Sequence, residues 1–179
     1  VHTWGTSTGP ADTFAVPNTL AGRNVTAVSA GFVHALALTD ESGGKVYAWG
    51  ANTWGETTVP VAAQSNVVAI SAGWHGSLAV KSDGTLVYWG YDPGDATSLA
   101  LLPTVDVGHT FVGAALGDNQ AVAFDNAGKG YAWGWNSYDA ATIPAALTGK
   151  QIVSVASGER MSAAVTSGAS GSGNTLAAV

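Results

Sequence analysis

The chain has 179 residues, of which 46% are hydrophobic and only 10% are charged, with six Lys or Arg against twelve Asp or Glu. A formal net charge of −6 and scattered basic residues argue against nucleic acid as a partner, because phosphate contacts need clustered Lys and Arg. Apolar runs stop well short of the roughly 18 residues that span a bilayer, so we expect no membrane insertion. No cysteine is present, which excludes disulfides and thiolate metal sites.

Four Trp-Gly pairs divide the chain into near-equal units and begin at Trp4, Trp49, Trp89 and Trp133. They recur about every 40 to 45 residues, a period that belongs to propeller blades and related arrays. Because these tryptophans recur at one position of the unit, we expect all of them in the core of a blade.

The segments of each unit follow one order. After each Trp-Gly pair comes a loop that ends in proline, at Pro17, Pro60, Pro103 and Pro144. An apolar stretch that closes on glycine comes next, over residues 25–31, 67–73, 111–117 and 152–158. Three variable residues separate it from a short apolar run, over residues 35–38, 77–80, 121–124 and 162–165. A turn rich in Gly, Asp, Asn and Ser then leads to the next Trp-Gly strand.

These apolar runs are typical of strands, because they are about four to seven residues long and rich in Val, Ile, Tyr and Trp. No amphipathic helical stretch of ordinary length appears. We therefore predict an all-β fold of β-propeller-type blades made of antiparallel strands. Residues 1–168 would form one domain of about four repeats, and residues 169–179 a Gly/Ser-rich connector with a short terminal strand.

The second unit carries a family resemblance. It reads Val46-Tyr-Ala-Trp-Gly-Ala-Asn-Thr-Trp-Gly55, then Thr58-Val-Pro60, then Val68-Ala-Ile-Ser-Ala-Gly73 and Ser77-Leu-Ala-Val-Lys81. This pattern resembles the regulator-of-chromosome-condensation (RCC1) repeat, with the bacterial branch and its β-lactamase-inhibitory propellers as the closer match. The resemblance covers about residues 1–168 and implies a propeller fold. One propeller architecture hosts many activities, so it says little about function.

Propellers of this family usually close a ring of seven blades, whereas this chain has four units. Three arrangements follow. The strand within 174–179 could complete the sheet begun by residues 2–4 and close a four-bladed ring, several chains could assemble a larger ring, or the chain could form an open arc. We favour assembly or an open arc, because blades angled for a seven-fold ring would have to change greatly to close with four.

No catalytic constellation stands out. His34 and His75 lie at near-equivalent loop positions, but no histidine pair has metal-ligand spacing and no cysteine accompanies them. Asp92 and Asp95 flank Pro93-Gly94, a combination typical of turns. We predict no catalytic residue, no metal, no cofactor and no enzymatic activity.

The residues that follow each closing glycine are the candidates for binding. In the inhibitor propellers that this chain resembles, aromatics in this loop face the bound protein. We expect these loops to share one rim, and the partner-contacting residues there to be Phe32, His34, Trp74, His75, Asp118, Asn119, Glu159 and Arg160. Large aromatics on a rigid frame are typical anchors of protein interfaces. The alternative is that both aromatics only pack over the blade ends.

The sequence therefore predicts a non-catalytic module that binds a protein partner, with enzyme inhibition as one version. Low charge, abundant Thr, Ser, Ala and Gly, and seven tryptophans resemble secreted bacterial β-proteins, so we expect an extracellular, cell-surface or particle-surface location. The alternative is a structural or decoration subunit of a virion, filament or surface layer. Its open blade edges would then pair with neighbouring copies, as a homo-oligomer that completes the ring.

Overall fold

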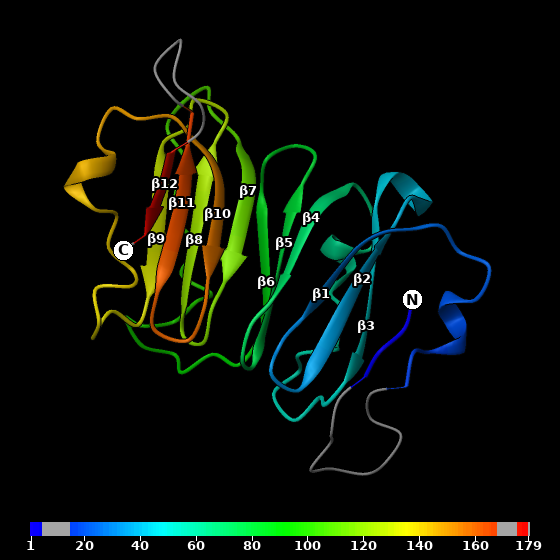
Figure 1. The fold of residues 1–179 in the computed structure, drawn as a ribbon. Helices are drawn as coiled ribbons and strands as arrows, with labels where there is room; N and C mark the ends of the chain where they lie inside the picture. The colour runs from blue at the N-terminus through cyan, green and yellow to red at the C-terminus, as the bar shows by residue number, and fades with distance from the viewer. Residues whose placement is uncertain (5–14, 168–174, 179) are drawn as a thin grey trace.

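The computed structural model describes residues 1–4, 15–167 and 175–178. This part of the chain forms four three-stranded antiparallel sheets in chain order (Figure 1). They are made of β1 (Val25–Ala30), β2 (His34–Thr39) and β3 (Lys45–Gly50); β4 (Val67–Ala72), β5 (Gly76–Lys81) and β6 (Leu86–Gly90); β7 (Phe111–Leu116), β8 (Gln120–Asp125) and β9 (Gly130–Gly134); and β10 (Ile152–Ser157), β11 (Ser162–Thr166) and β12 (Thr175–Ala178). The prediction of an all-β fold with propeller-type blades is confirmed.

The four sheets pack face to face in a row, with the first and the last at opposite ends (Figure 1). Of the three arrangements considered, the chain by itself adopts the open arc. Most of the connector predicted over residues 169–179 lies outside the described residues. Within that range, β12 pairs antiparallel with β11 as the third strand of the last sheet.

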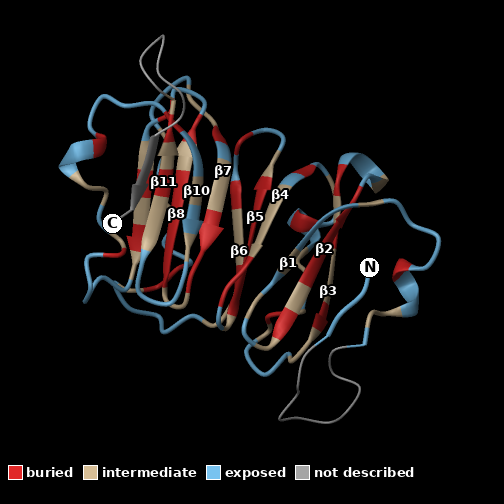
Figure 2. Ribbon diagram, in the orientation of Figure 1, coloured by how far each residue is buried: buried red, intermediate tan, exposed pale blue. Residues whose placement is uncertain are grey.

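The middle strands of the first three sheets are largely buried, which places the core between the blades, whereas β11 of the last sheet is only partly buried (Figure 2). Neighbouring sheets cover both faces of β5 and β8, so these strands read as continuous apolar runs rather than alternating ones. One small residue recurs at the centre of every middle strand, where it lets the sheets approach closely: Ala37, Ala79, Ala123 and Ala164.

Short 3-10 helices close the outer loops. Three of them, η1 (Asn18–Leu20), η3 (Val61–Ala63) and η4 (Ala145–Leu147), each follow a proline whose φ lies between −62° and −69°. The proline ring fixes that angle in advance of the turn. Each helix buries one apolar side chain, Leu20, Ala63 or Leu147, against its blade. A fourth, η2 (Glu41–Gly43), lies in the β2–β3 loop.

The repeated tryptophans divide into two groups. Trp49, Trp89 and Trp133 lie on the third strands and are 7 to 8% exposed, as expected for blade core. The indole N–H of Trp89 donates to Glu56 O at 2.8 Å. Trp4, in contrast, is 92% exposed, so its predicted place in a core is wrong. Residues 1–4 form no strand, and the ring therefore has no sheet to hold it inside a blade.

Candidate functional site

Four equivalent turns, one in each sheet, join the first and second strands along one rim of the arc. In each, the glycine N–H closes the turn on a carbonyl three residues later, as from Gly31 to His34 O at 2.9 Å and from Gly73 to Gly76 O at 2.9 Å. The residue after the glycine therefore occupies the same place in every blade. These residues are Phe32, Trp74, Asp118 and Glu159.

Backbone hydrogen bonds tie each of the first three turns to the next blade. The N–H of Phe32 donates to Gly73 O at 3.1 Å, that of Trp74 to Gly117 O at 3.3 Å, and that of Asp118 to Gly158 O at 3.3 Å. The accepting carbonyl lies where a Cβ on the glycine of the preceding turn would stand. This contact explains the repeated glycine and fixes the spacing of the residues along the rim.

The four residues after the glycines line one groove of about 440 Å³. Phe32 is 70% exposed and Trp74 37% exposed, and their ring centroids are 6.2 Å apart at 63°. Asp118 is half-buried and Glu159 exposed. Burial, and then the nearby charge of Glu159, raise the pKa of Asp118. The structure thus brings together the two aromatics and two acids that the sequence analysis expected on one rim.

His34 does not belong to this surface. Its side chain is buried between the first two sheets, where Nε2 lies 2.9 Å from Ser77 Oγ. Because the Ser77 hydroxyl donates to Glu56 O, we assign the Nε2–H tautomer, in which His34 donates to Ser77. Burial lowers the pKa of His34, which favours the neutral ring. The expectation that His34 contacts a partner is corrected: it joins two blades instead.

His75 links the groove to the outer loops. Its Nδ1 lies 3.2 Å from the carboxylate of Glu56, a residue that is fully buried. The imidazole ring is 4.4 Å from the Trp74 ring and 6.1 Å from the Trp54 ring, measured between centroids. Since about a quarter of its side chain is exposed, His75 contributes to the surface mainly by holding its aromatic neighbours.

Ring contacts continue outward from His75. Trp54 lies 4.9 Å from Tyr91, so Phe32, Trp74, His75, Trp54 and Tyr91 form one continuous line of rings, here called the aromatic row. The sequence analysis did not include Trp54 or Tyr91 in the site. Strand pairing could have found them: β2 and β3 pair His34 with Gly50, which places the start of the outer loop beside the turn.

A second aromatic group lies on the last two blades. Trp135 and Tyr138 are 5.5 Å apart at 85°, and the guanidinium of Arg160 lies 5.0 Å from the Tyr138 ring centroid. Arg160 Nε also contacts a Glu159 carboxylate oxygen at 3.1 Å. Asn119 lines a hollow of about 230 Å³ together with Tyr91 and Trp135. Asn119 and Arg160, which the sequence analysis expected on the rim of the turns, therefore border this second aromatic group.

The other polar groups have structural partners. Asp92 accepts the N–H of Gly94 at 2.9 Å and Asp95 that of Thr97 at 2.8 Å, as expected for turn residues. Within residues 1–4, 15–167 and 175–178, no group of three His, Cys, Asp or Glu side chains is placed to hold a metal ion. No helix in that part of the chain has the length and apolar character needed to cross a membrane.

Comparison with known proteins finds a family match for one segment of the chain. Residues 25–55 match the model of the regulator of chromosome condensation (RCC1) repeat. The structure is also similar to that of Prp20p, the RCC1 of Saccharomyces cerevisiae, with a TM-score of 0.62 and 21% identity over 83% of this chain and 45% of that one. Residues 25–55 therefore match one repeat of the RCC1 type.

Two further proteins resemble this chain. Protein pim1 of Schizosaccharomyces pombe is 27% identical over 155 residues, which cover 66% of this chain and 28% of that protein. The CRINKLY ectodomain of the Arabidopsis thaliana receptor kinase ACR4 has a TM-score of 0.62 and 16% identity, over 88% of this chain and 51% of that one. The chain therefore spans about half or less of each of these proteins.

Proposed function

We propose that this chain is a non-catalytic module that binds a protein partner on the rim formed by the aromatic row and its groove. The observation that carries the proposal is the aromatic row itself. Exposed Phe32 and Trp74 lie in ring contact on turns fixed by backbone hydrogen bonds. The His75 ring links them to exposed Trp54 in the outer loop. Rigid aromatics lose little conformational entropy on binding and serve as interface hot spots.

The relatives support this function in general terms. Prp20p of Saccharomyces cerevisiae has binding properties to Gsp1p and histones, and yeast RCC1 (Prp20) has been seen bound to Kap60. Each of these is a protein partner, but the chain spans less than half of Prp20p. The partner of this chain is therefore proposed by class only, as a protein.

Alanine substitution of the aromatic anchors tests the proposal. Immobilised wild-type protein and the Phe32→Ala/Trp74→Ala variant would be used to capture proteins from the source organism, and the captured protein would be purified and titrated by calorimetry. We expect the variant to bind at least about 30-fold more weakly, because hot-spot truncations cost about 2 kcal/mol or more.

The matched control is Val107→Ala. Val107 is fully exposed and precedes β7 at the other end of the sheets, next to Asp106, which bonds to Lys129. It should leave both capture and affinity unchanged, and circular dichroism should show the same melting curve for all variants. Equal affinity of the wild type and the aromatic variant for every captured protein would contradict the proposal.

We further propose an extracellular or surface location and, as one version of the function, inhibition of a bound enzyme. The composition supports the location, and the resemblance to inhibitory propellers supports the inhibition. Fractionation of the source organism with an antibody against the chain tests the location. Recovery of the chain only from the cell interior would overturn it.

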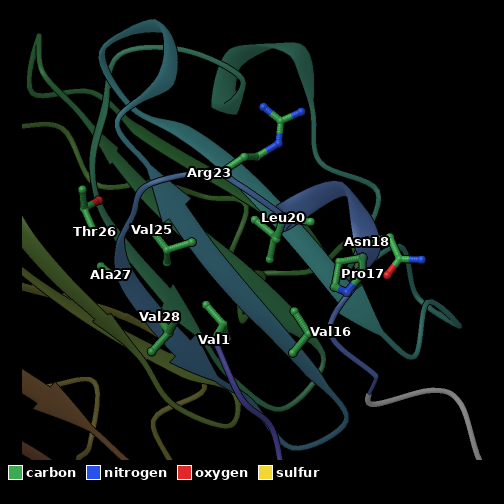
Figure 3. Close-up of a pocket in the computed structure, with 11 residues that line it drawn as sticks. Val1, Val16, Pro17, Asn18, Leu20, Arg23, Val25, Thr26, Ala27 and Val28 are labelled. Atoms are coloured by element: carbon green, nitrogen blue, oxygen red, sulfur yellow. The ribbon is translucent and has the colours of Figure 1, made fainter.

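A second candidate function, assembly of several copies, is favoured by the two end sheets. A Cβ at Gly158 would meet nothing closer than Met161 O at 3.9 Å, whereas the equivalent glycines each receive a carbonyl from the next blade. At the other end of the arc, Val1, Val16, Val25 and Val28 border a hollow of about 610 Å³ (Figure 3). The first blade of a second copy would then place its Gly31 carbonyl against Gly158, repeating the contact found inside the chain.

Sedimentation of the wild type and Gly158→Ala tests this assembly. If copies join end to end, the wild type should sediment as multiples of 17.9 kDa and the variant as a single chain with unchanged melting. A wild type that remains a single chain at about 1 mM, a concentration that would reveal even weak association, would remove assembly as a function of these residues.

A further inference from the structure

The groove at the four turns is charged with one sign. Among the residues that line it, all in the described part of the chain, the charged side chains are Asp118 and Glu159. The rest are apolar or small residues, and the groove wall also includes the backbone of Gly73 and Gly117. A groove of about 440 Å³ with two carboxylates and two aromatic rings favours a cation over an anion or a purely apolar group.

Asp118 carries the strongest sign of a missing partner. It is half-buried, and no group within the described residues donates a hydrogen bond to its carboxylate or forms an ion pair with it. Partly buried carboxylates are normally paired, because desolvation disfavours the charged form. That cost raises the pKa of Asp118 and the charge of Glu159 adds to it, while His75 and Arg160 lower it by less, so the net pKa is raised. A cation in the groove would relieve both effects.

Backbone carbonyls add to the negative potential. Gly73 O and Gly117 O each accept one hydrogen bond from the preceding turn. Their partial negative charges lie at the wall of the groove. A guanidinium or ammonium group brings three to five donors and could bond to both carboxylates.

The two aromatic rings complete the site. Phe32 and Trp74 meet at 63°, so they do not stack face to face and they leave ring surface exposed at the groove. Ring faces attract cations within about 6 Å. The nearest arginine of the chain, Arg160, is already held by Tyr138 and Glu159 on the outer side.

We propose that this groove binds a lysine or arginine side chain of the protein partner, held between the rings of Phe32 and Trp74 and the carboxylates of Asp118 and Glu159. The inference rests on the proposed protein-binding function and specifies its chemistry. The partner would present a basic side chain at the centre of its interface. The overall charge of −6 would favour the approach of such a surface.

A small peptide tests the groove without the partner. The probe is acetyl-Gly-Arg-Gly-amide, with acetyl-Gly-Gln-Gly-amide as the neutral match, followed through the indole N–H resonances of the tryptophans and with Trp74 assigned by Trp74→Phe. We expect the arginine peptide to shift the Trp74 resonance saturably. Added salt should lower the affinity of the protein for this peptide. The inference would be overturned by an equal shift with the glutamine peptide, or by the absence of any shift with the arginine peptide at about 50 mM.

Charge-removing variants test the carboxylates. Asp118→Asn/Glu159→Gln should lower the affinity for the arginine peptide at least about fivefold, as expected for loss of two partly solvated ion pairs. The control, Asp83→Asn/Asp106→Asn, removes the same charge from loops at the other end of the sheets. This control should bind the arginine peptide with wild-type affinity. An equal loss of affinity in both double variants would mean that only the net charge of the protein matters, and it would overturn the groove as the site.

The partner experiment separates this inference from the proposed function. If Phe32→Ala/Trp74→Ala loses the partner while Asp118→Asn/Glu159→Gln keeps full affinity, the binding rim stands and the cation site fails. If both variants keep full affinity, the proposed function fails and the inference with it. Loss of affinity in both, with the charge variant less sensitive to salt, is the expected result.

Discussion

Gly73→Ala is expected to lower the free energy of unfolding by about 3 kcal/mol or more, the upper range for forcing an atom into a packed interior. A Cβ at this position would lie 2.2 Å from Gly117 O and 2.8 Å from Leu116 Cγ. Gly117 O also accepts the Trp74 N–H, so it cannot withdraw without breaking the bond between the second and third blades. The clash is with backbone, and the sheets would have to separate.

Gly158→Ala is the matched control, because it is the same change at the same place of the repeat. Within the single chain, the nearest atom to a new Cβ there is Met161 O at 3.9 Å. In dilute protein, where copies do not associate, stability should therefore change by less than about 0.5 kcal/mol. Urea unfolding of both variants measures the difference. Equal stability of Gly73→Ala and Gly158→Ala would show that the close carbonyl does not explain the repeated glycine.

Asp125→Ala is expected to cost about 3 to 5 kcal/mol, as for removal of one partner from a buried ionic network. The carboxylate of Asp125, at the end of β8, is almost fully buried. Oδ2 lies 2.8 Å from His109 Nδ1 and accepts the Tyr131 hydroxyl at 3.0 Å. Oδ1 accepts the N–H groups of Ala127 and Lys129 at 3.0 and 2.9 Å. Alanine would leave all of these groups without their acceptor.

The hydrogen bonds of the Asp125 carboxylate should also make the stability of the protein depend on pH in the acid range. Burial alone would raise the pKa of Asp125, but hydrogen bonds from His109, the Lys129 N–H, Tyr131 and the Ala127 N–H outweigh it, and the net pKa is lowered. The unfolded chain then binds this proton more tightly than the folded one. The stabilisation is therefore complete above the ordinary carboxyl pKa of about 4 and is lost as the pH falls through the lower native pKa.

Unfolding of wild type, Asp125→Ala and Asp125→Asn between pH 7 and pH 2 checks both effects. The wild type should lose stability below about pH 4 more steeply than Asp125→Asn, which has no carboxyl group to titrate. Asp40→Ala, at an exposed position with one bond from Asn24, serves as the surface control. Parallel pH curves for wild type and Asp125→Asn would contradict the role assigned to the carboxylate.

Much of the fold follows from periodic features of the sequence. The Trp-Gly period, the prolines and the apolar runs indicate repeated blades, because each feature has a local cause in strand propensity or turn chemistry. The grouping of Phe32, Trp74, Asp118 and Glu159 also follows, since equivalent positions of a repeat lie at equivalent places in space.

The features that the sequence did not reveal depend on neighbours. Trp4 shares the Trp-Gly motif with the buried tryptophans but is exposed, because burial requires a paired strand and the motif alone does not supply one. His34 follows its turn as His75 does, yet it is buried against Ser77 of the next blade. The second sheet has Gly76 at the corresponding strand position and the third has Gln120, which is buried and donates to Gly158 O of the next blade at 2.6 Å. The contact between blades therefore recurs with a different side chain, and no shared residue type marks it in the sequence.

The sequence by itself determined the repeat, the strand content, the turn glycines and the order of residues along the rim, because these depend on local backbone preferences that recur in every unit. Tertiary structure decided the open arc, the inward position of His34, the aromatic row through Trp54 and Tyr91, and the Asp125 network. These depend on which side chains meet across blades or across distant loops. Such contacts are set by packing between segments, and a single sequence does not encode them in any local pattern.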